Sequence, residues 1–508
     1  MPRLILANLV TALAVVAGAG CVTHQPALAT TAPRPAAKPS SAVRALQSQL
    51  DAVFNAPIMA HAAWGVDVRS LDRGDVLFSL NADKLAMPAS NMKILTLAAA
   101  AQVLGWDFRF ATVLETSAAV ENGVLRGDLI IRGNGDPTIS TRGNRGQAVF
   151  DEWAAALRAA GITSIHGRIV ADDQAFDDEG VGPGWSWDYL EAGYAAPVGA
   201  LQYNENTADL TVAAGAVPGD PAIVELAPGS GLVVVNRAVT GEPSPSGSRG
   251  AIDVRRRIDR PELEISGTIP AGAPVIRRTV AVINPTLFFV ESARNALVAR
   301  GIDVVGAAVD GDEIAAELPG GSERRVLATT MSPPLREMAG VLMKVSQNQY
   351  AETFLKAAGA TRGGLGTTAA GRRVAAETFT AWGIPATTYV MSDGSGLSRY
   401  NYIAPSTITA ILARMYADPV HRDAFVSTLP VAGRDGTLST RMRRSPAEGN
   451  AAAKTGSIAN VRSLSGYVRT RGGETLVFAI VANDFVVPAA TVNWITDLAV
   501  EILANASR

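Results

Sequence analysis

The hydrophobic pattern of the first regular stretch predicts a helix followed by a hairpin. After Ser41, apolar residues recur every three or four positions, at Val43, Leu46, Leu50 and Val53. This spacing predicts an amphipathic helix. Apolar and polar residues then alternate over 63–68, and a second, mainly apolar run follows over 76–79 after a turn, which predicts two antiparallel strands.

A second helix is predicted over 90–104. Pro88 precedes this Leu- and Ala-rich run and Gly105 follows it, and these are residues typical of helix starts and helix ends. Helical spacing returns after Pro333-Pro334. The C-terminal part combines a predicted strand over 476–482 with a final helix over 492–504.

The middle of the chain has a different pattern of apolar residues. Between about residues 110 and 328, short Val- and Ile-rich segments are separated by Gly, Pro, Asp and Asn, which predicts a β-rich region. The chain has 508 residues, and at about 150 residues per domain this length suggests roughly three domains.

Composition excludes several classes of protein. Hydrophobic residues make up 48% and charged residues 18% of the chain, which argues against a disordered protein. The net charge of -2 gives no electrostatic basis for binding nucleic acid. The four histidines do not have the spacing of a zinc site, so we expect no metal. We expect no other cofactor either.

The N-terminus predicts export. Arg3 is followed by an apolar run over 4–19 that is shorter than the roughly 20 residues needed to span a bilayer. A signal peptide of residues 1–29 would be cleaved after Ala29; the alternative is a lipoprotein signal of residues 1–20 with lipid attached to Cys21. A Pro-, Ala- and Ser-rich linker, 30–41, follows. We expect a periplasmic or cell-envelope protein, tethered to the membrane if Cys21 is lipidated.

Three short motifs carry the candidate chemistry. Ser90 and Lys93 are three residues apart in the predicted helix, so the hydroxyl and the amine share one face. Ser346 and Asn348 lie between two predicted helices, and Lys454-Thr455-Gly456-Ser457 lies on a predicted strand. Each motif alone is weak, but their order and context are specific. A phosphate-binding loop at Lys454 is excluded because Ala453 replaces the required glycine.

In this order the motifs resemble those of the penicillin-interacting serine enzymes. The chain is similar to the D-alanyl-D-alanine carboxypeptidase/endopeptidase family of low-molecular-mass penicillin-binding proteins, peptidase group S13, from about residue 42 to its end. Gln347 stands at a position where Asp is frequent in the wider superfamily. Further family-like segments are 133–138, 203–206, 393–399 and 429–438.

The resemblance implies an α/β fold. A transpeptidase/β-lactamase-like domain, with an antiparallel sheet and flanking helices, would comprise residues 42–110 and 329–508. It would be interrupted by a large β-rich insertion of two smaller domains. One inserted domain would comprise residues 111–165 and 285–328, and the other, nested within it, residues 166–284. The long gap between the first and second motifs accommodates this insertion.

The scarcity of histidine excludes a Ser-His-Asp triad, so a lysine has to activate the serine. We expect desolvation and the charge of Lys454 to lower the pKa of Lys93. The resemblance assigns catalytic roles to Ser90, Lys93 and Ser346. It assigns the backbone N–H groups of Ser90 and Ser457 to the oxyanion hole. It places Asn348, Lys454, Thr455 and Ser457 at the substrate.

The implied activity is a serine D-alanyl-D-alanine carboxypeptidase, with endopeptidase activity as an extension. Its partners would be peptidoglycan stem peptides ending in D-Ala-D-Ala, with β-lactams as covalent inhibitors. Two alternatives stay open: a β-lactamase of the same fold, and a catalytically silent penicillin-binding lipoprotein.

Three features outside the motifs also carry expectations. The acidic residues Asp172, Asp173, Asp177, Asp178 and Glu179 predict a solvated loop rather than a calcium site. Trp185 and Trp187 are interpreted as core or loop anchors. Because all three motifs lie outside 111–328, we expect the insertion to take no part in acylation.

Overall fold

The computed structural model describes residues 40–245, 247–317 and 320–508, and the compact unit begins at Ser41. The predicted signal segment and Cys21 lie outside the described residues, as does the linker up to residue 39. Within the described ranges, no helix is both long enough and apolar enough to cross a membrane.

A five-stranded antiparallel sheet, in the order β2-β1-β22-β21-β20, joins the two ends of the described chain. Its strands are β1 (Ala63–Ser70), β2 (Val76–Leu80), β20 (Ala452–Ile458), β21 (Val461–Arg469) and β22 (Thr475–Asn483). The predicted hairpin and C-terminal strand are therefore confirmed. Strand β20, which carries the third motif, lies at one edge of the sheet.

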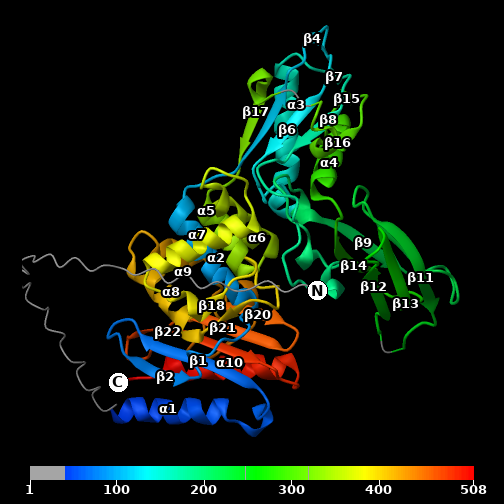
Figure 1. Cartoon of the computed structure of the whole chain (residues 1–508). Coiled ribbons are helices and arrows are strands. Elements are labelled where there is room, and N and C mark those ends of the chain that lie inside the picture. The colour runs from blue at the N-terminus through cyan, green and yellow to red at the C-terminus, as the bar shows by residue number, and fades with distance from the viewer. Residues whose placement is uncertain (1–39, 246, 318–319) are drawn as a thin grey trace, which may run out of the picture. The chain divides into compact units, whose positions relative to one another are not determined.

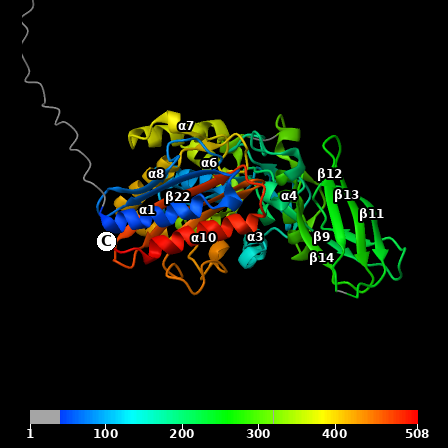
Figure 2. The same cartoon turned by 90° about the horizontal axis from the view of Figure 1, so that it is seen from below.

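Helices cover both faces of this sheet (Figures 1 and 2). On one face, α1 (Ser41–Phe54) and α10 (Ala489–Asn505) pack against Phe478 and Ile480 of β22. On the other, a helical layer packs against Val477 and Ala479 of the same strand. Alternate residues of β22 therefore enter opposite cores, which explains the unbroken apolar run that predicted this strand.

The second face is covered by a layer of helices around a buried centre. Helix α2 (Met92–Leu104) is buried on all sides from Met92 to Ala101, so its Leu- and Ala-rich sequence reflects packing with neighbouring helices. The surrounding helices are α5 (Leu335–Lys344), α6 (Asn348–Ala360), α7 (Thr368–Ala381), α8 (Pro405–Ala417) and α9 (Arg422–Thr428). A two-stranded ladder, β18 (Tyr389–Val390) and β19 (Tyr402–Ile403), completes this part.

The inserted region contains a mixed five-stranded sheet in the order β16-β8-β6-β3-β17. Its strands are β3 (Ala111–Thr116), β6 (Leu129–Gly133), β8 (Ile169–Asp172), β16 (Ala308–Asp310) and β17 (Arg325–Met331). A small neighbouring sheet comprises β4 (Val120–Glu121), β5 (Val124–Leu125), β7 (Ser164–Ile165) and β15 (Asp303–Val304).

Two long helices in this region were not expected from the sequence. They are α3 (Arg145–Ala159) and α4 (Pro285–Ala299), which pack together beside the mixed sheet. Helix α3 buries Phe150, Trp153 and Leu157, whose helical spacing is the signal that the β-rich interpretation overlooked.

The rest of the insertion consists of two three-stranded sheets that share one core. The first contains β9 (Thr207–Ala213), β10 (Ile223–Leu226) and β14 (Ile276–Ala281); the second contains β11 (Val233–Gly241), β12 (Ala251–Arg256) and β13 (Glu262–Pro270). The division of the chain into domains remains a prediction. Strand β8 lies beyond the predicted boundary at residue 166 but pairs with β6 and β16.

A buried ion cluster joins three strands of the inserted sheet. The side chain of Arg324, only 7% exposed, contacts Asp172 on β8 and Glu115 on β3 immediately before β17 begins. Charges removed from water need such partners, and loss of one partner leaves the others buried and uncompensated.

We expect Arg324→Leu to lower the free energy of unfolding by about 3–5 kcal/mol, because the buried Asp172 carboxylate loses its cation while Glu115 keeps Arg132 as a partner at 2.6 Å. Equilibrium urea unfolding followed by tryptophan fluorescence measures this change. The control is Arg325→Leu on the exposed neighbour, expected within about 0.5 kcal/mol of the wild type. Equal losses in both variants would contradict a specific role for the cluster.

Candidate active site

The three motifs converge on one pocket of about 550 Å³. Ser90 comes from the turn before α2, Ser346 and Asn348 from the α5–α6 junction, and Thr455 and Ser457 from the edge strand β20. All the predicted site residues except Lys93 and Lys454 line this pocket, and the two lysines are completely buried behind it.

Ser90 lies in a single 3-10 turn, Ala89–Asn91, rather than in the α-helix that was predicted to include it. The side chain of Asn91 donates to the Lys454 carbonyl at 3.0 Å, which ties this turn to β20. Gly456 makes the close approach feasible: a Cβ there would lie 2.7 Å from the Pro88 carbonyl and 3.1 Å from the Ser90 nitrogen. The nucleophile's turn is therefore pressed directly against the sheet edge.

The Lys93 amine is enclosed by three acceptors. Its Nζ lies 3.0 Å from Ser90 Oγ, 2.6 Å from Asn348 Oδ1 and 2.7 Å from the Ser395 carbonyl oxygen. Burial lowers the pKa of Lys93 to about 7, against an opposing attraction from the carboxylates of Asp393 and Glu352. Desolvation is the main cause of this low pKa, so the expected contribution of the Lys454 charge to Lys93 is not the dominant effect.

Ser346 and Lys454 form a second serine–lysine pair. Lys454 Nζ donates to Ser346 Oγ at 2.8 Å and to the Thr455 carbonyl at 2.7 Å. Burial, and then the positive charge of Lys93, lower the pKa of Lys454 well below its usual value. Ser346 has a left-handed backbone, φ 63°, between α5 and α6. The pair thus places a second lysine of lowered pKa beside a serine hydroxyl at the pocket.

Asn348 bridges Lys93 and the inserted region. Its Oδ1 accepts from Lys93, and its Nδ2 donates to the Tyr194 carbonyl at 2.6 Å. These contacts fix the orientation of the amide. The Nδ2 retains one further N–H that a substrate carbonyl can accept.

Two buried carboxylates behind the site were not assigned from the sequence. Glu352, four residues after Asn348 on α6, accepts from the backbone nitrogens of Gly394 and Ser395 at 2.9 and 2.7 Å. Burial, and then the Asp393 charge, raise the pKa of Glu352 to about 7. The four-residue spacing from Asn348 was the available signal, since it places both side chains on one helix face.

The inserted region also lines the pocket, a feature that the motifs did not indicate, whereas its absence from acylation stays a prediction. Tyr189 and Tyr194 line the pocket. Trp185 is buried and donates to Asp393 at 2.8 Å, so it is a loop anchor as expected, whereas Trp187 is 65% exposed. Further hydrogen bonds join the insertion to α6 and its N-terminus, linking Gln202 to Gln349 and Thr353, Glu205 to Gln347, and Asp177 to Lys356.

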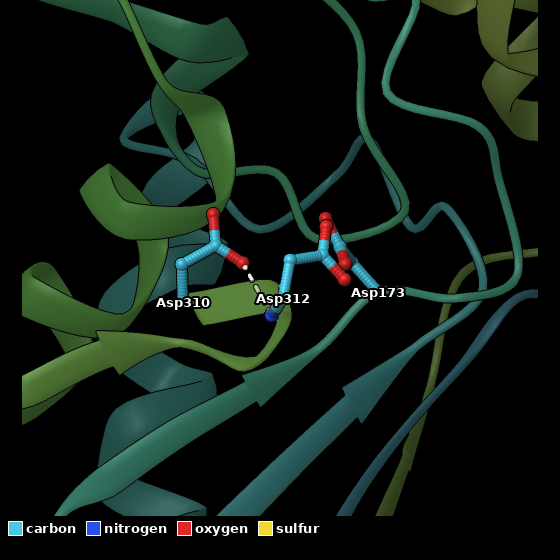
Figure 3. A group of neighbouring side chains, drawn as sticks. All are labelled: Asp173, Asp310 and Asp312. Carbon is cyan, nitrogen blue, oxygen red and sulfur yellow. Dashed lines mark hydrogen bonds between the residues drawn. The ribbon is translucent and has the colours of Figure 1, made fainter. Parts of the chain in front are cut away.

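Away from the pocket, Asp173, Asp310 and Asp312 bring carboxylate oxygens within 4.8 Å of one another (Figure 3). Asp173 accepts from Thr286, and Asp310 accepts from Asn284 Nδ2 at 2.8 Å. Burial raises the pKa of Asp173 to about 6. The expected solvated loop is wrong for Asp172 and Asp173, each 8% exposed, because both carboxylates are satisfied by other protein groups.

Comparison with known proteins places the chain in a family. The family model for D-Ala-D-Ala carboxypeptidase 3 (S13) matches residues 46–505. The chain belongs to this family. It is 33% identical over 457 residues to the D-alanyl-D-alanine carboxypeptidase of Actinomadura sp. (strain R39), covering 87% of this chain and 82% of that protein. The predicted family and enzyme class, a serine D-alanyl-D-alanine carboxypeptidase, are thereby confirmed.

A second curated relative is similar over most of the chain, and a solved structure shares the fold. The Haemophilus influenzae D-alanyl-D-alanine carboxypeptidase DacB is 27% identical over 431 residues, which are 83% of this chain and 85% of that protein. The crystal structure of penicillin binding protein 4 (dacB) from Haemophilus influenzae matches with a TM-score of 0.77 at 24% identity. It covers 91% of this chain and 99% of that chain. The predicted fold class is confirmed.

If Lys93 is the base, we expect Glu352→Gln to move the acidic limb of penicillin acylation to lower pH. A base must be neutral, so the limb follows the Lys93 pKa of about 7. Around pH 7 part of the Glu352 population is ionised, because its own pKa is about 7, and Glu352→Gln removes that attraction for the ammonium form. The Lys93 pKa therefore falls, and more of the amine is neutral near pH 7. Second-order acylation rates from pH 5 to 9 measure the limb.

The control is Glu377→Gln on the exposed surface of α7, which should leave the limb in place. A limb that stays fixed in Glu352→Gln, or moves to higher pH, would contradict the electrostatic assignment. The prediction concerns only the pH of the acidic limb. A lower maximal rate in Glu352→Gln therefore neither supports nor contradicts it.

Proposed function

We propose that this protein releases the terminal D-Ala from peptidoglycan stem peptides through an acyl-enzyme on Ser90. The observation that carries the proposal is the contact between Ser90 Oγ and the fully buried Lys93 amine at 3.0 Å. With a pKa of about 7, roughly half of Lys93 is neutral at pH 7, whereas an ordinary lysine with a pKa near 10.4 is neutral in about 1 molecule in 2,500. A neutral amine can accept the serine proton.

Acylation then begins when Lys93 takes the Ser90 proton and Ser90 Oγ attacks the carbonyl carbon of the penultimate D-Ala. The backbone N–H groups of Ser90 and Ser457 receive the developing oxyanion. Such donors each contribute about 3–4 kcal/mol to transition-state stability in a comparable serine enzyme. Both residues line the pocket, and Ser457 is exposed to it, which supports this assignment.

The leaving D-Ala needs a proton on its nitrogen as the peptide bond breaks. Ser346 is positioned to supply that proton and to recover one from Lys454, its partner at 2.8 Å. Thr455, Ser457 and the positive charge of Lys454 would receive the substrate's terminal carboxylate. Thr455 Oγ1 is held by Thr437 Oγ1 at 2.8 Å, and both threonines line the pocket. Asn348 would bind the substrate amide through its remaining N–H.

A β-lactamase of the same fold is less well supported. Rapid release of penicillin needs a base that activates water against the acyl-enzyme ester. Among the described residues, the pocket is lined by no aspartate or glutamate. Glu352 binds two backbone N–H groups of the turn behind Lys93, so its oxygens are engaged away from the pocket.

A catalytically silent scaffold is also disfavoured. Such a protein would have a disrupted nucleophile–base pair or a filled pocket. Here the Ser90–Lys93 and Ser346–Lys454 pairs are intact and face an open pocket of about 550 Å³.

The substrate sets the location that we propose. Peptidoglycan lies outside the cytoplasmic membrane, so the enzyme would act in the periplasm or cell envelope after export. The segment 1–29 would be its signal peptide, with lipidation of Cys21 as the alternative that adds a membrane tether. Crosslinked stem peptides would be a further substrate, because their crosslink is also a peptide bond to a D-Ala carbonyl.

We expect a labelled penicillin to attach covalently to Ser90, because the β-lactam carbonyl meets the same activated hydroxyl. Peptide mapping by mass spectrometry locates the label. Ser90→Ala should lose it, while Ser427→Ala, which changes a serine outside the pocket, should retain it. Labelling of another serine, or undiminished labelling of Ser90→Ala, would refute the assignment of the nucleophile.

We also expect D-Ala release from pentapeptide muropeptides to be many times faster than decay of the penicilloyl-enzyme. After acylation by a peptide the leaving group departs, whereas the opened β-lactam keeps its leaving nitrogen tethered where water must approach. Quenched time courses of both reactions on one preparation, read by mass, compare the two rates. Mass loss from crosslinked dimers reports endopeptidase activity. Repeated penicillin hydrolysis without D-Ala release would favour the β-lactamase.

A further inference from the structure

The turn Asp393–Ser398 lies directly behind the reacting groups, yet the proposed chemistry assigns it no role. Every residue of this turn is buried. It contributes the Ser395 carbonyl to Lys93, and it packs against the turn that carries Ser90. A Cβ at Gly396 would lie 1.9 Å from the Ala89 carbonyl oxygen, so the two turns are in direct backbone contact.

The contacts of Lys93 define where its lone pair points. A neutral amine has two N–H groups and one lone pair. Asn348 Oδ1 at 2.6 Å and the Ser395 carbonyl at 2.7 Å can only accept hydrogen bonds, so they engage the two N–H groups. The lone pair is then left for Ser90 Oγ at 3.0 Å. Displacement of either acceptor would free the amine to rotate and would weaken the alignment that proton transfer needs.

Asp393 holds the Ser395 carbonyl in place. Its fully buried carboxylate accepts from the backbone nitrogens of Gly396 and Ser398 at 2.8 and 2.7 Å, and from Asn401 Nδ2 at 2.7 Å. These bonds close the turn around Ser395. The Ser395 hydroxyl also donates to this carboxylate, at 3.3 Å. The remaining donor is Trp185 Nε1 at 2.8 Å, which comes from the inserted region 208 residues earlier in the chain.

We propose that Trp185 is a positioning residue for acylation, which acts through Asp393 to hold the Ser395 carbonyl against the Lys93 amine. The inference rests on the proposed function, because it concerns the same base. Trp185 does not line the pocket, so its effect falls on the acylation step and not on the initial binding of substrate or inhibitor. The inserted region thereby contributes to catalysis through a hydrogen bond as well as through the pocket wall.

The test compares Trp185→Phe with Trp187→Phe. The first substitution removes the buried N–H donor and keeps an aromatic ring, and the second makes the same change on an exposed side chain of the same loop. Stopped-flow kinetics with a reporter β-lactam separate the dissociation constant of the first complex from the acylation rate constant. Thermal unfolding shows that each variant is folded at the assay temperature.

We expect Trp185→Phe to lower the acylation rate constant at least about tenfold, the order expected for one hydrogen bond to a charged group, with the dissociation constant changed less than twofold. Trp187→Phe should match the wild type in both constants. A wild-type acylation rate in folded Trp185→Phe would overturn the proposal. So would a loss that falls on the dissociation constant, or an equal loss in Trp187→Phe.

A double-mutant cycle with Asp393→Asn tests the route of the effect. If Trp185 acts through Asp393, adding Trp185→Phe to the Asp393→Asn variant should lower the acylation rate constant by less than about a further twofold. If the two substitutions instead lowered the acylation rate constant independently, so that their effects multiplied, Trp185 would not act through Asp393. The outcome is separable from failure of the proposed function, because that failure would appear as a wild-type enzyme whose penicillin label is not on Ser90.

Discussion

A lysine amine kept out of water is the interaction on which the rest of this structure depends. Desolvation lowers the pKa of Lys93 to about 7, and any route for water to its amine would restore the charge that prevents it from acting as a base. The enclosure needs α2, the N-terminus of α6 and the turn at Ser395, which are far apart in the sequence. The packing of the helical layer therefore also sets the pKa of Lys93.

Much of this arrangement could be predicted from local sequence. The two strands of the hairpin, the strand carrying Lys454 and the helix after Ser90 each have a clear pattern of apolar residues and boundary residues. The pairing of Ser90 with Lys93 was expected from their i, i+3 spacing, although Ser90 lies in the 3-10 turn before α2. The meeting of the three motifs in one site could not be derived that way, and it was expected only because the order of the motifs resembles a known family. The hydrogen bond between Ser346 and Lys454 was not expected at all.

Other features lay beyond local patterns. The hydrogen bond from Trp185 to Asp393 joins residues from the insertion and the helical layer, and neither local sequence requires a partner of that kind. Likewise, the acidic residues near Asp172 suggested solvent exposure, whereas Arg324 and Thr286, both distant in sequence, allow Asp172 and Asp173 to be buried. Helix α3 was different, because the spacing of Phe150, Trp153 and Leu157 was visible but was outweighed by the surrounding β-rich texture.

The two glycines on either side of the nucleophile's turn limit how this enzyme could evolve resistance to β-lactams. A side chain at Gly396 or Gly456 would collide with the backbone at Ala89 or Pro88 and displace the serine for antibiotic and natural substrate alike. Selection for antibiotic escape with retained cell-wall activity therefore has little freedom at these positions. It is directed instead to other residues that line the pocket, such as Tyr189 and Tyr194, whose side chains can change without moving the serine.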